Sequence, residues 1–259
     1  MRTRVAVVLA AAAVSSLSLF SPAEATHSWN NYHWARTSNP FTLQVGNNLD
    51  ASWAVYYNTS NTDWSKSSLL DLAPVAGLTT PRKCRATAGR VEVCNAAYGN
   101  NGWLGVASIS ISGGEHITQG TAKMNDTYFN TSTYNNPNEK LHVMCQEVGH
   151  TFGLGHTSEN GSSQNTCMDY FSNTGLNATS AASTHPNAHD YEELGIIYTH
   201  TDSSTTVASA TATTGHDVGT DRASWGREVA RGAHGEFSVF ERDFGDGQKV
   251  ITHVTWATR

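Results

Sequence analysis

One segment, VMCQEVGHTFGLGH, restricts the fold and chemistry of this chain more than any other. In an α-helix, side chains four residues apart lie on one face, about 6 Å apart along the axis. Gln146 and His150 form such a pair, so both can reach one metal ion. Glu147 points beside that ion, where a carboxylate can accept a proton from water. Gly153 suits the sharp turn that ends the helix and brings His156 back toward His150.

The run from Gln146 to His156 resembles the metzincin pattern H-E-x-x-H-x-x-G-x-x-H of zinc endopeptidases. It matches at Glu147, His150, Gly153 and His156, and it differs at Gln146, where the pattern has its first histidine. The resemblance implies one catalytic zinc ion held at positions 146, 150 and 156. It also implies that Glu147 acts as the general base.

Two further residues extend the resemblance. Met168 follows His156 by twelve residues in the run TCMDY, where metzincins have a turn with a methionine beneath the metal. Tyr170 stands where astacin-like and serralysin-like members have a tyrosine that ligates zinc or stabilises the oxyanion. We therefore take Glu147 and Tyr170 as the candidate catalytic residues. In the clan, extended substrate pairs with an edge strand, which predicts a substrate strand along residues 104–110.

Gln146 is the exception that any account of the metal must address. A neutral amide oxygen is a weaker zinc ligand than imidazole. Either its oxygen binds the ion, or Tyr170, His150, His156 and water complete the coordination. His142 lies one helical turn before Gln146, about 12 Å along the axis from His150, which is too far for a shared ion. We expect His142 to be a helix-surface histidine.

The patterning predicts an α+β fold, a zincin/metzincin-like catalytic domain with a mixed twisted sheet, an active-site helix and a C-terminal helix, plus a small β-hairpin tail. Pro137 and Asn138 mark the start of the active-site helix, with Asn138 as its N-cap, and the C-terminal helix runs from about Asp190 to Tyr198. His185, His189 and Asp190 are expected to cap that helix or line the cleft. The peptidase domain is predicted to cover residues 26–200, followed by a Ser/Thr-rich linker at 201–220 and a β-rich segment at 221–259.

The N-terminus indicates export. A positive MRTR start, an apolar stretch and a final AEA predict a signal peptide over residues 1–25, so we expect a secreted, extracellular protein. The four cysteines then favour disulfides. Of three possible pairings we prefer Cys84–Cys94, which closes a short loop, and Cys145–Cys167, which affects the site. Asp126 is a weak candidate for a structural calcium ion.

The function predicted from these residues is secreted zinc-dependent cleavage of protein or peptide substrates. The net charge of −6 and the lack of a basic face argue against nucleic acid, and the mature chain lacks an apolar run long enough to enter a membrane. We expect a monomer. The alternative is a catalytically inactive metzincin-like protein that binds peptide or protein, and Gln146 is its main support.

Overall fold

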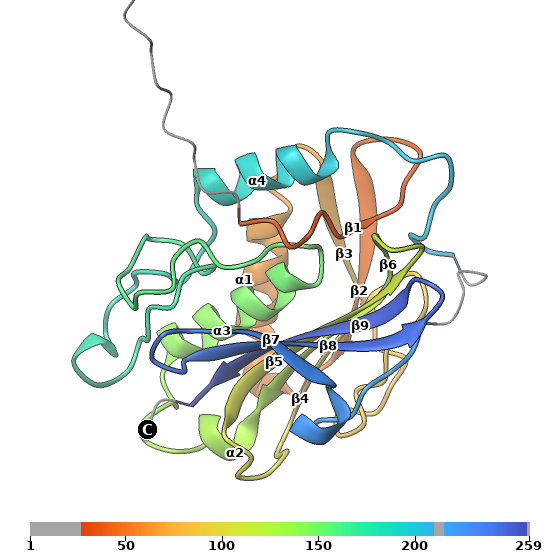
Figure 1. Ribbon diagram of the computed structural model, residues 1–259. Coiled ribbons are helices and arrows are strands. Elements are labelled where there is room, and N and C mark those ends of the chain that lie inside the picture. Colours follow the sequence, from red (N-terminus) through yellow and green to blue (C-terminus); the bar gives the residue numbers. More distant parts are fainter. Residues whose placement is uncertain (1–26, 210–214, 258–259) are drawn as a thin grey trace, which may run out of the picture.

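The computed structural model describes residues 27–209 and 215–257. The predicted signal peptide, residues 1–25, lies outside the described residues. A nine-stranded sheet runs through the molecule in the order β3-β2-β4-β6-β5-β9-β8-β7, with β1 pairing with β6 (Figure 1). Helices α1 and α3 pack against each other, and α3 also contacts β5, β6 and β9. This is the mixed α+β architecture that the sequence predicts.

The strands are β1 (His33–Trp34), β2 (Phe41–Asn48), β3 (Leu70–Ala76), β4 (Val91–Ala96), β5 (Trp103–Ser112), β6 (His116–Asn125), β7 (Arg227–Arg231), β8 (Phe237–Gly245) and β9 (Gln248–Trp256). The α-helices are α1 (Ala54–Trp64), α2 (Asp126–Phe129), α3 (Pro137–His150) and α4 (Ala188–Tyr198). In the described ranges, no helix is both long and apolar enough to cross a membrane.

The sheet has a parallel half and an antiparallel half that meet at β5. Strands β2, β3, β4 and β6 pair in parallel, and β5 is antiparallel to β6. On its other side β5 pairs with β9, again antiparallel, and β8 and β7 continue the sheet outward. The expected hairpin is therefore present as β8–β9, but it extends the main sheet and is not a separate tail.

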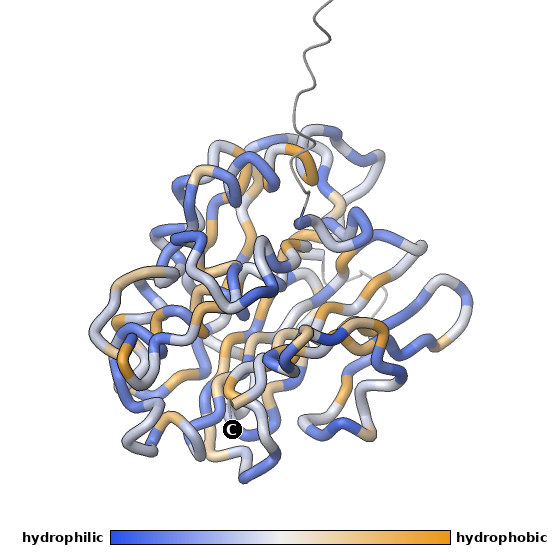
Figure 2. The backbone as a smooth tube through the Cα atoms, turned by 60° about the vertical axis from the view of Figure 1, so that its left-hand side comes forward, coloured by the Kyte–Doolittle hydropathy of each residue, from blue (hydrophilic) through white to orange (hydrophobic). Residues whose placement is uncertain are grey.

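Burial explains why the C-terminal strands belong to the main domain. Nearly every residue of β5 and β6 is buried, as expected for strands covered on both faces. Phe237 of β8 and Ile251 of β9 lie in the principal hydrophobic core. Figure 2 shows apolar residues concentrated along the strands and hydrophilic residues in the outer loops. Pro74 is tolerated in β3 because that strand lies at the sheet edge.

The helix ends differ slightly from the sequence prediction. The N-cap of α3 is Asn136 and not Asn138, because the Asn136 side chain accepts a 2.9 Å hydrogen bond from the Glu139 amide. Helix α4 begins two residues earlier than expected, at Ala188, with a capping box formed by Asn187 and Asp190.

The segment predicted as a linker packs on the domain where the structure describes it. The amide of Thr206 donates to the Ala35 carbonyl at 2.9 Å, and the amide of Ala208 donates to the Gly89 carbonyl at 2.8 Å. Beyond residue 214, the carbonyl of His216 accepts a 2.7 Å hydrogen bond from Ser110 of β5. These hydrogen bonds hold the segment on the surface of the domain, because each contributes about 0.5–1.5 kcal/mol after the loss of a hydrogen bond to water.

Both predicted disulfides, Cys84–Cys94 and Cys145–Cys167, are present, and none of the four cysteines is free. The second joins the middle of α3 to the loop that carries Met168 and Tyr170. Its sequence separation of 22 residues corresponds to about 3 kcal/mol of stabilisation in the loop-entropy model.

Candidate active site

His150, at the end of α3, has one nitrogen fixed by the backbone and one left free. Its Nδ1 lies 2.8 Å from the Leu154 carbonyl, which can only accept, so Nδ1 carries the proton. Its Nε2 has no hydrogen-bond partner and is buried. Burial lowers the pKa of His150 to about 4, which keeps the ring neutral. A neutral imidazole with one free nitrogen is the form that binds a metal ion.

His156 is brought beside His150 by the expected turn. Gly153 has φ of 97°, and its amide donates to the His150 carbonyl at 3.2 Å. A side chain at this position would collide with the Tyr32 carbonyl, so both backbone conformation and space require glycine. The two imidazole rings lie 4.5 Å apart at 80°, and Nε2 of His156 is also buried without a partner.

Glu147 lies in the interior beside these rings. Burial raises the pKa of its carboxyl group to about 8. Oε1 lies 2.7 Å from the hydroxyl of Thr255 in β9, and Oε2 has no partner. The carboxylate packs directly over Gly105 of β5, where a side chain would collide with it. Gly105 of β5 therefore leaves space for Glu147, the residue that the sequence predicts as the general base.

Tyr170 and Met168 lie on the loop that packs against α3. The Tyr170 ring lies 4.2 Å from the His156 ring and stacks on Phe237 at 4.5 Å. Its hydroxyl is buried and unpartnered, and burial raises its pKa well above the usual value, so it stays a neutral hydrogen-bond donor. Met168 is fully buried against Gly149 of α3, which lacks the Cβ that would collide with the sulfur.

Gln146 is engaged by the methionine-turn loop and by β9. Its Nε2 donates to the carbonyls of Cys167 at 3.0 Å and Asp169 at 2.8 Å. Its Oε1 lies 3.0 Å from the Thr255 hydroxyl. In this arrangement all the polar atoms of the amide have protein partners, and its role as a metal ligand stays a prediction.

His142 corrects another sequence-based expectation. It is buried and does not lie on the helix surface, with Nδ1 3.0 Å from Asn173 Oδ1 and Nε2 3.2 Å from the Asp169 carbonyl. His142 and Gln146 are four residues apart on α3, so they face the same loop and share one carbonyl. Together they attach the helix to the loop that carries Tyr170.

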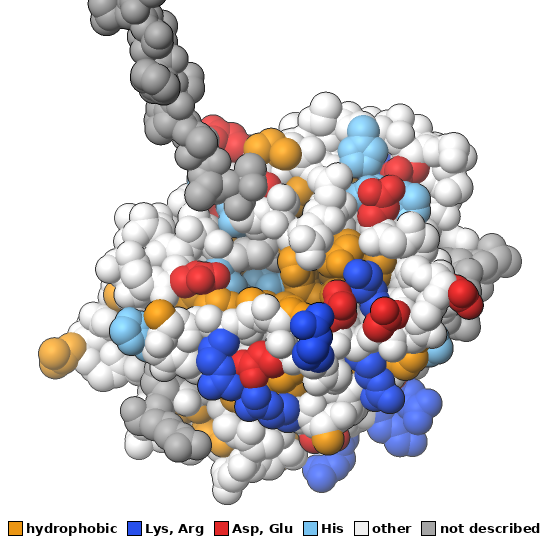
Figure 3. Space-filling model, in the orientation of Figure 1, with side chains coloured by type: hydrophobic (Ala, Val, Ile, Leu, Met, Phe, Trp, Pro, Cys, Tyr) orange, Lys and Arg blue, Asp and Glu red, His pale blue; other side chains and the backbone are white. Residues whose placement is uncertain are grey.

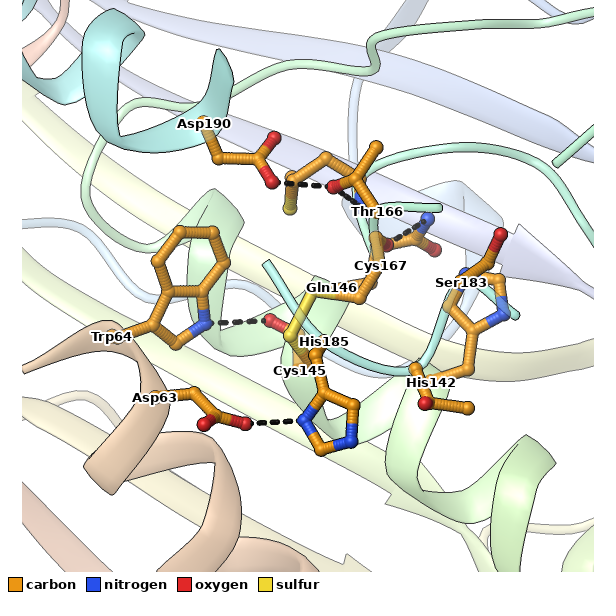
Figure 4. The surroundings of a disulfide bond; sticks show 12 residues. Asp63, Trp64, His142, Cys145, Gln146, Thr166, Cys167, Ser183, His185 and Asp190 are labelled. Atoms are coloured by element: carbon orange, nitrogen blue, oxygen red, sulfur yellow. Dashed lines mark hydrogen bonds and ion pairs between the residues drawn. A yellow bond between two sulfur atoms is a disulfide. The ribbon is translucent and has the colours of Figure 1, made fainter. Parts of the chain in front are cut away.

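Figure 4 shows how the Cys145–Cys167 disulfide crosses this same junction. On one side, the indole of Trp64 in α1 donates to the Cys145 carbonyl at 3.1 Å. On the other side, Thr166 donates to Asp190 of α4. The loop is therefore tied to α3 and α4, and α1 holds α3 at the same point, so the positions of the loop's side chains are set by the rest of the domain.

The remaining sequence candidates serve structural roles. His185 Nδ1 lies 2.6 Å from an Asp63 carboxylate oxygen, and His189 stacks on His27. Asp190 caps α4 as expected. Asp126 accepts hydrogen bonds on both oxygens, from Trp53 at 2.9 Å and Asn95 at 2.6 Å, so its carboxylate is already engaged.

His253 of β9 is a site residue that sequence reasoning missed. Its ring stacks on His150 at 3.9 Å and 4°, and both of its nitrogens are buried without a partner. Potential ligand atoms of His150, His156 and His253 all lie within 4.8 Å of one another. A ligating imidazole has the metal near its plane, so two parallel rings cannot share an ion until one of them turns. The signal was available in the alternating run ITHVTW, which puts His253 and Thr255 on one face.

The site is closed by the strand that carries His253. Strand β9 runs antiparallel to β5 along Trp103–Ile111, the stretch at which the sequence predicts that substrate would pair. The side chains of Glu147 and His150 are fully buried, and Tyr170 is 7% exposed. In this conformation the protein's own C-terminal strand occupies the place expected for a substrate.

Comparisons with known proteins give little beyond this geometry. No family model and no curated protein matches the chain. Among solved structures, the chain is similar to high choriolytic enzyme 1, a hatching-enzyme zinc protease from the medaka fish Oryzias latipes. The match has a TM-score of 0.35 and 10% identity over 64% of this chain and 94% of that one. At that level it supports no conclusion about function, which must come from the residues.

Proposed function

We propose that the protein is a secreted zinc-dependent endopeptidase of the metzincin type, folded in a form that its own C-terminal strand keeps closed. The observation that carries the proposal is the convergence of two buried, unpartnered imidazole nitrogens, on His150 and His156, beside the buried carboxylate of Glu147. Such groups are costly to bury unsatisfied, and a bound zinc ion would satisfy both nitrogens.

The donor set fits zinc better than a harder ion. Imidazole nitrogen suits zinc, whereas calcium and magnesium take oxygen ligands. His253 is the nearest further nitrogen donor, and no hydrogen bond fixes its ring. We assign it as the third donor of the closed form, after rotation of the ring. Once β9 has left, Gln146 or Tyr170 remains to complete the site.

In the open form, each residue has a defined part in peptide hydrolysis. Zinc, when bound, polarises the scissile carbonyl and makes a water molecule more acidic. Glu147 accepts a proton from the attacking water and delivers it to the departing amine. Tyr170 donates a hydrogen bond to the oxyanion. The vacated edge of β5 holds the extended substrate by backbone hydrogen bonds.

Because β9 covers the edge of β5, a second function is also possible, in which the protein binds peptide or protein without cleaving it. In that case β9 is a permanent member of the sheet and the histidines have no catalytic task. The two functions differ in one respect that can be tested, which is whether removing β9 from the edge of β5 produces activity.

The test uses the full chain with a recognition sequence for a specific protease inserted in the exposed turn at residues 233–235. After cutting, the protein is assayed on casein in rising urea below its main unfolding transition, which allows the hairpin to dissociate. We expect chelator-sensitive cleavage in the cut protein, and none in the uncut protein or in cut Glu147→Gln protein. Loss of the hairpin, seen by size-exclusion chromatography, with zinc bound and no cleavage would establish the binding protein instead.

A further inference from the structure

A second group of metal-binding side chains lies outside the candidate active site. It combines His33 of β1 with His200 and Asp202, which follow α4. The three potential ligand atoms all lie within 4.8 Å of one another. Figure 3, in the orientation of Figure 1, shows histidine and acidic side chains gathered at the upper right of the molecule. This region lies beyond the end of α4 and near the start of β6.

The spacing of these atoms matches one small ion. His33 Nε2 lies 3.2 Å from His200 Nε2 and 3.4 Å from Asp202 Oδ1, and His200 Nε2 lies 3.7 Å from the same oxygen. A tetrahedral zinc ion with bonds near 2.0–2.1 Å requires ligand atoms about 3.3 Å apart. The rings of His33 and His200 lie edge to face at 89° and not stacked, and their Nε2 atoms are close to each other.

The hydrogen bond at one ring nitrogen of His33 leaves the other nitrogen facing the group. Its Nδ1 lies 2.7 Å from the Asn31 carbonyl, which can only accept, so Nδ1 carries the proton of the neutral ring. Nε2 then presents a lone pair toward Asp202 Oδ1, which can only accept, and toward His200 Nε2, which can donate or accept. This nitrogen is on a residue that is only 1% exposed. A hydrogen bond from His200 satisfies one of these contacts and leaves two lone pairs facing each other at the other, whereas one divalent ion binds all three atoms.

The surroundings hold Asp202 in place for such a role. Its Oδ2 accepts from Arg36 twice, from Nη1 at 2.9 Å and from the backbone amide at 3.1 Å. The Asp202 amide donates back to the Arg36 carbonyl at 2.8 Å. Arg36 also donates to the carbonyls of Tyr198 and His200. The carboxylate is therefore fixed through one oxygen, with the other facing the histidines.

Two nearby titratable groups complete the description. His116 Nε2 lies 3.3 Å from Asp202 Oδ1. Glu115 lies 3.9 Å from the same His116 nitrogen. The negative charge of Glu115 partly offsets the positive charge of the Arg36 guanidinium. His200 is 43% exposed at its side chain, which leaves solvent to complete the coordination.

We propose that His33, His200 and Asp202 bind a second divalent ion of the zinc class, with a structural role. The ion would join the N-terminal strand to the segment that follows α4. That junction bears on the candidate active site, because Trp34 donates to the Thr151 carbonyl at 3.0 Å and Tyr198 donates to the Phe152 carbonyl at 2.9 Å. Both carbonyls belong to the turn between His150 and His156. The proposal does not depend on peptidase activity.

The test is the zinc content of the full chain, measured by mass spectrometry after equilibration with zinc and gel filtration. His200→Ala is the main variant, because the side chain is partly exposed and its loss should not prevent folding. We expect it to bind about one zinc fewer than the wild type, whether or not the active site is loaded. His234→Ala, an exposed histidine in the turn after β7, is the matched control and should keep the wild-type count.

A second measurement protects against an indirect effect. The melting temperature of the wild type should rise when zinc is added to metal-free protein. The rise should be smaller in both His200→Ala and Asp202→Asn, because neither variant can bind zinc at this second site. An unchanged zinc count in His200→Ala, or an equal loss in His234→Ala, would overturn the proposal.

Discussion

The hydroxyl of Thr255 lies 2.7 Å from Oε1 of Glu147, although 108 residues separate them in the chain. The last strand therefore supplies a hydrogen bond to the buried acid of the candidate site. The same hydroxyl lies 3.0 Å from Oε1 of Gln146. The strand that closes the site therefore also contacts two polar side chains of α3.

Thr255→Val should destabilise the closed protein. The substitution keeps the shape of the side chain but leaves Glu147 without that hydrogen bond, and a buried unsatisfied polar group costs about 1–3 kcal/mol. The free energy of unfolding, measured in urea, should fall by that amount. Thr255→Ser keeps the hydroxyl and should stay close to the wild type. Equal losses in the two variants would point to packing and not to the hydrogen bond.

His253→Ala should weaken zinc binding by the closed protein at least tenfold, if this imidazole is the third donor. Competition with a chelating dye on the full chain gives the affinity. His234→Ala changes a histidine of the same C-terminal segment that is exposed, and it should leave the affinity unchanged. Wild-type affinity in His253→Ala would mean that β9 covers the metal site without contributing a ligand.

Gln146→Leu separates the structural part of this residue from its predicted metal role. The substitution removes the donor to the Cys167 and Asp169 carbonyls, which should cost about 1–3 kcal/mol of stability. If Gln146 is not a ligand of the closed form, zinc affinity in the dye assay should be unchanged. A large fall in affinity in the folded variant would restore Gln146 to the ligand set.

Lys123 of β6 should give the protein a stability that rises with pH. The side chain is buried, and burial lowers its pKa from the usual 10.5, against the attraction of Asp217. Between the lowered value and 10.5 the unfolded chain binds more protons than the folded one, so stability increases with pH, by at most about 1.4 kcal/mol per unit.

Urea unfolding of Lys123→Met between neutral pH and pH 9.5 should lack this contribution to the slope. Lys83→Met, at an exposed position, serves as the control and should follow the wild type. A Lys123→Met profile parallel to that of the wild type would show that the buried ammonium group is not the source.

Local patterns predicted the parts of the fold that depend on neighbours in the chain. The active-site helix begins at Pro137, as predicted, and the C-terminal helix ends at Tyr198, as predicted. The cysteine count allowed three pairings, and the preferred one, with the short loop Cys84–Cys94, is the pairing found. The turn at Gly153 followed from the one residue type that adopts its backbone conformation without strain.

The errors came from contacts between distant segments. Nothing local in ITHVTW says that this strand pairs with β5, so the place of the hairpin in the sheet was not predicted and His253 was missed. His142 was expected at the surface because a helix position alone does not reveal the loop that covers it. The group formed by His33, His200 and Asp202 joins the two ends of the predicted peptidase domain, which no spacing rule connects.

The order of the strands has a consequence for synthesis. Strand β5 is made long before β9, so during translation its outer edge has no partner until residues 248–256 have emerged. A ribosome that stops before residue 248 would release a chain with a long apolar strand edge open to other molecules, which favours aggregation. A chain completed to β9 covers that edge as it folds, and the imidazoles beside it are enclosed from the start.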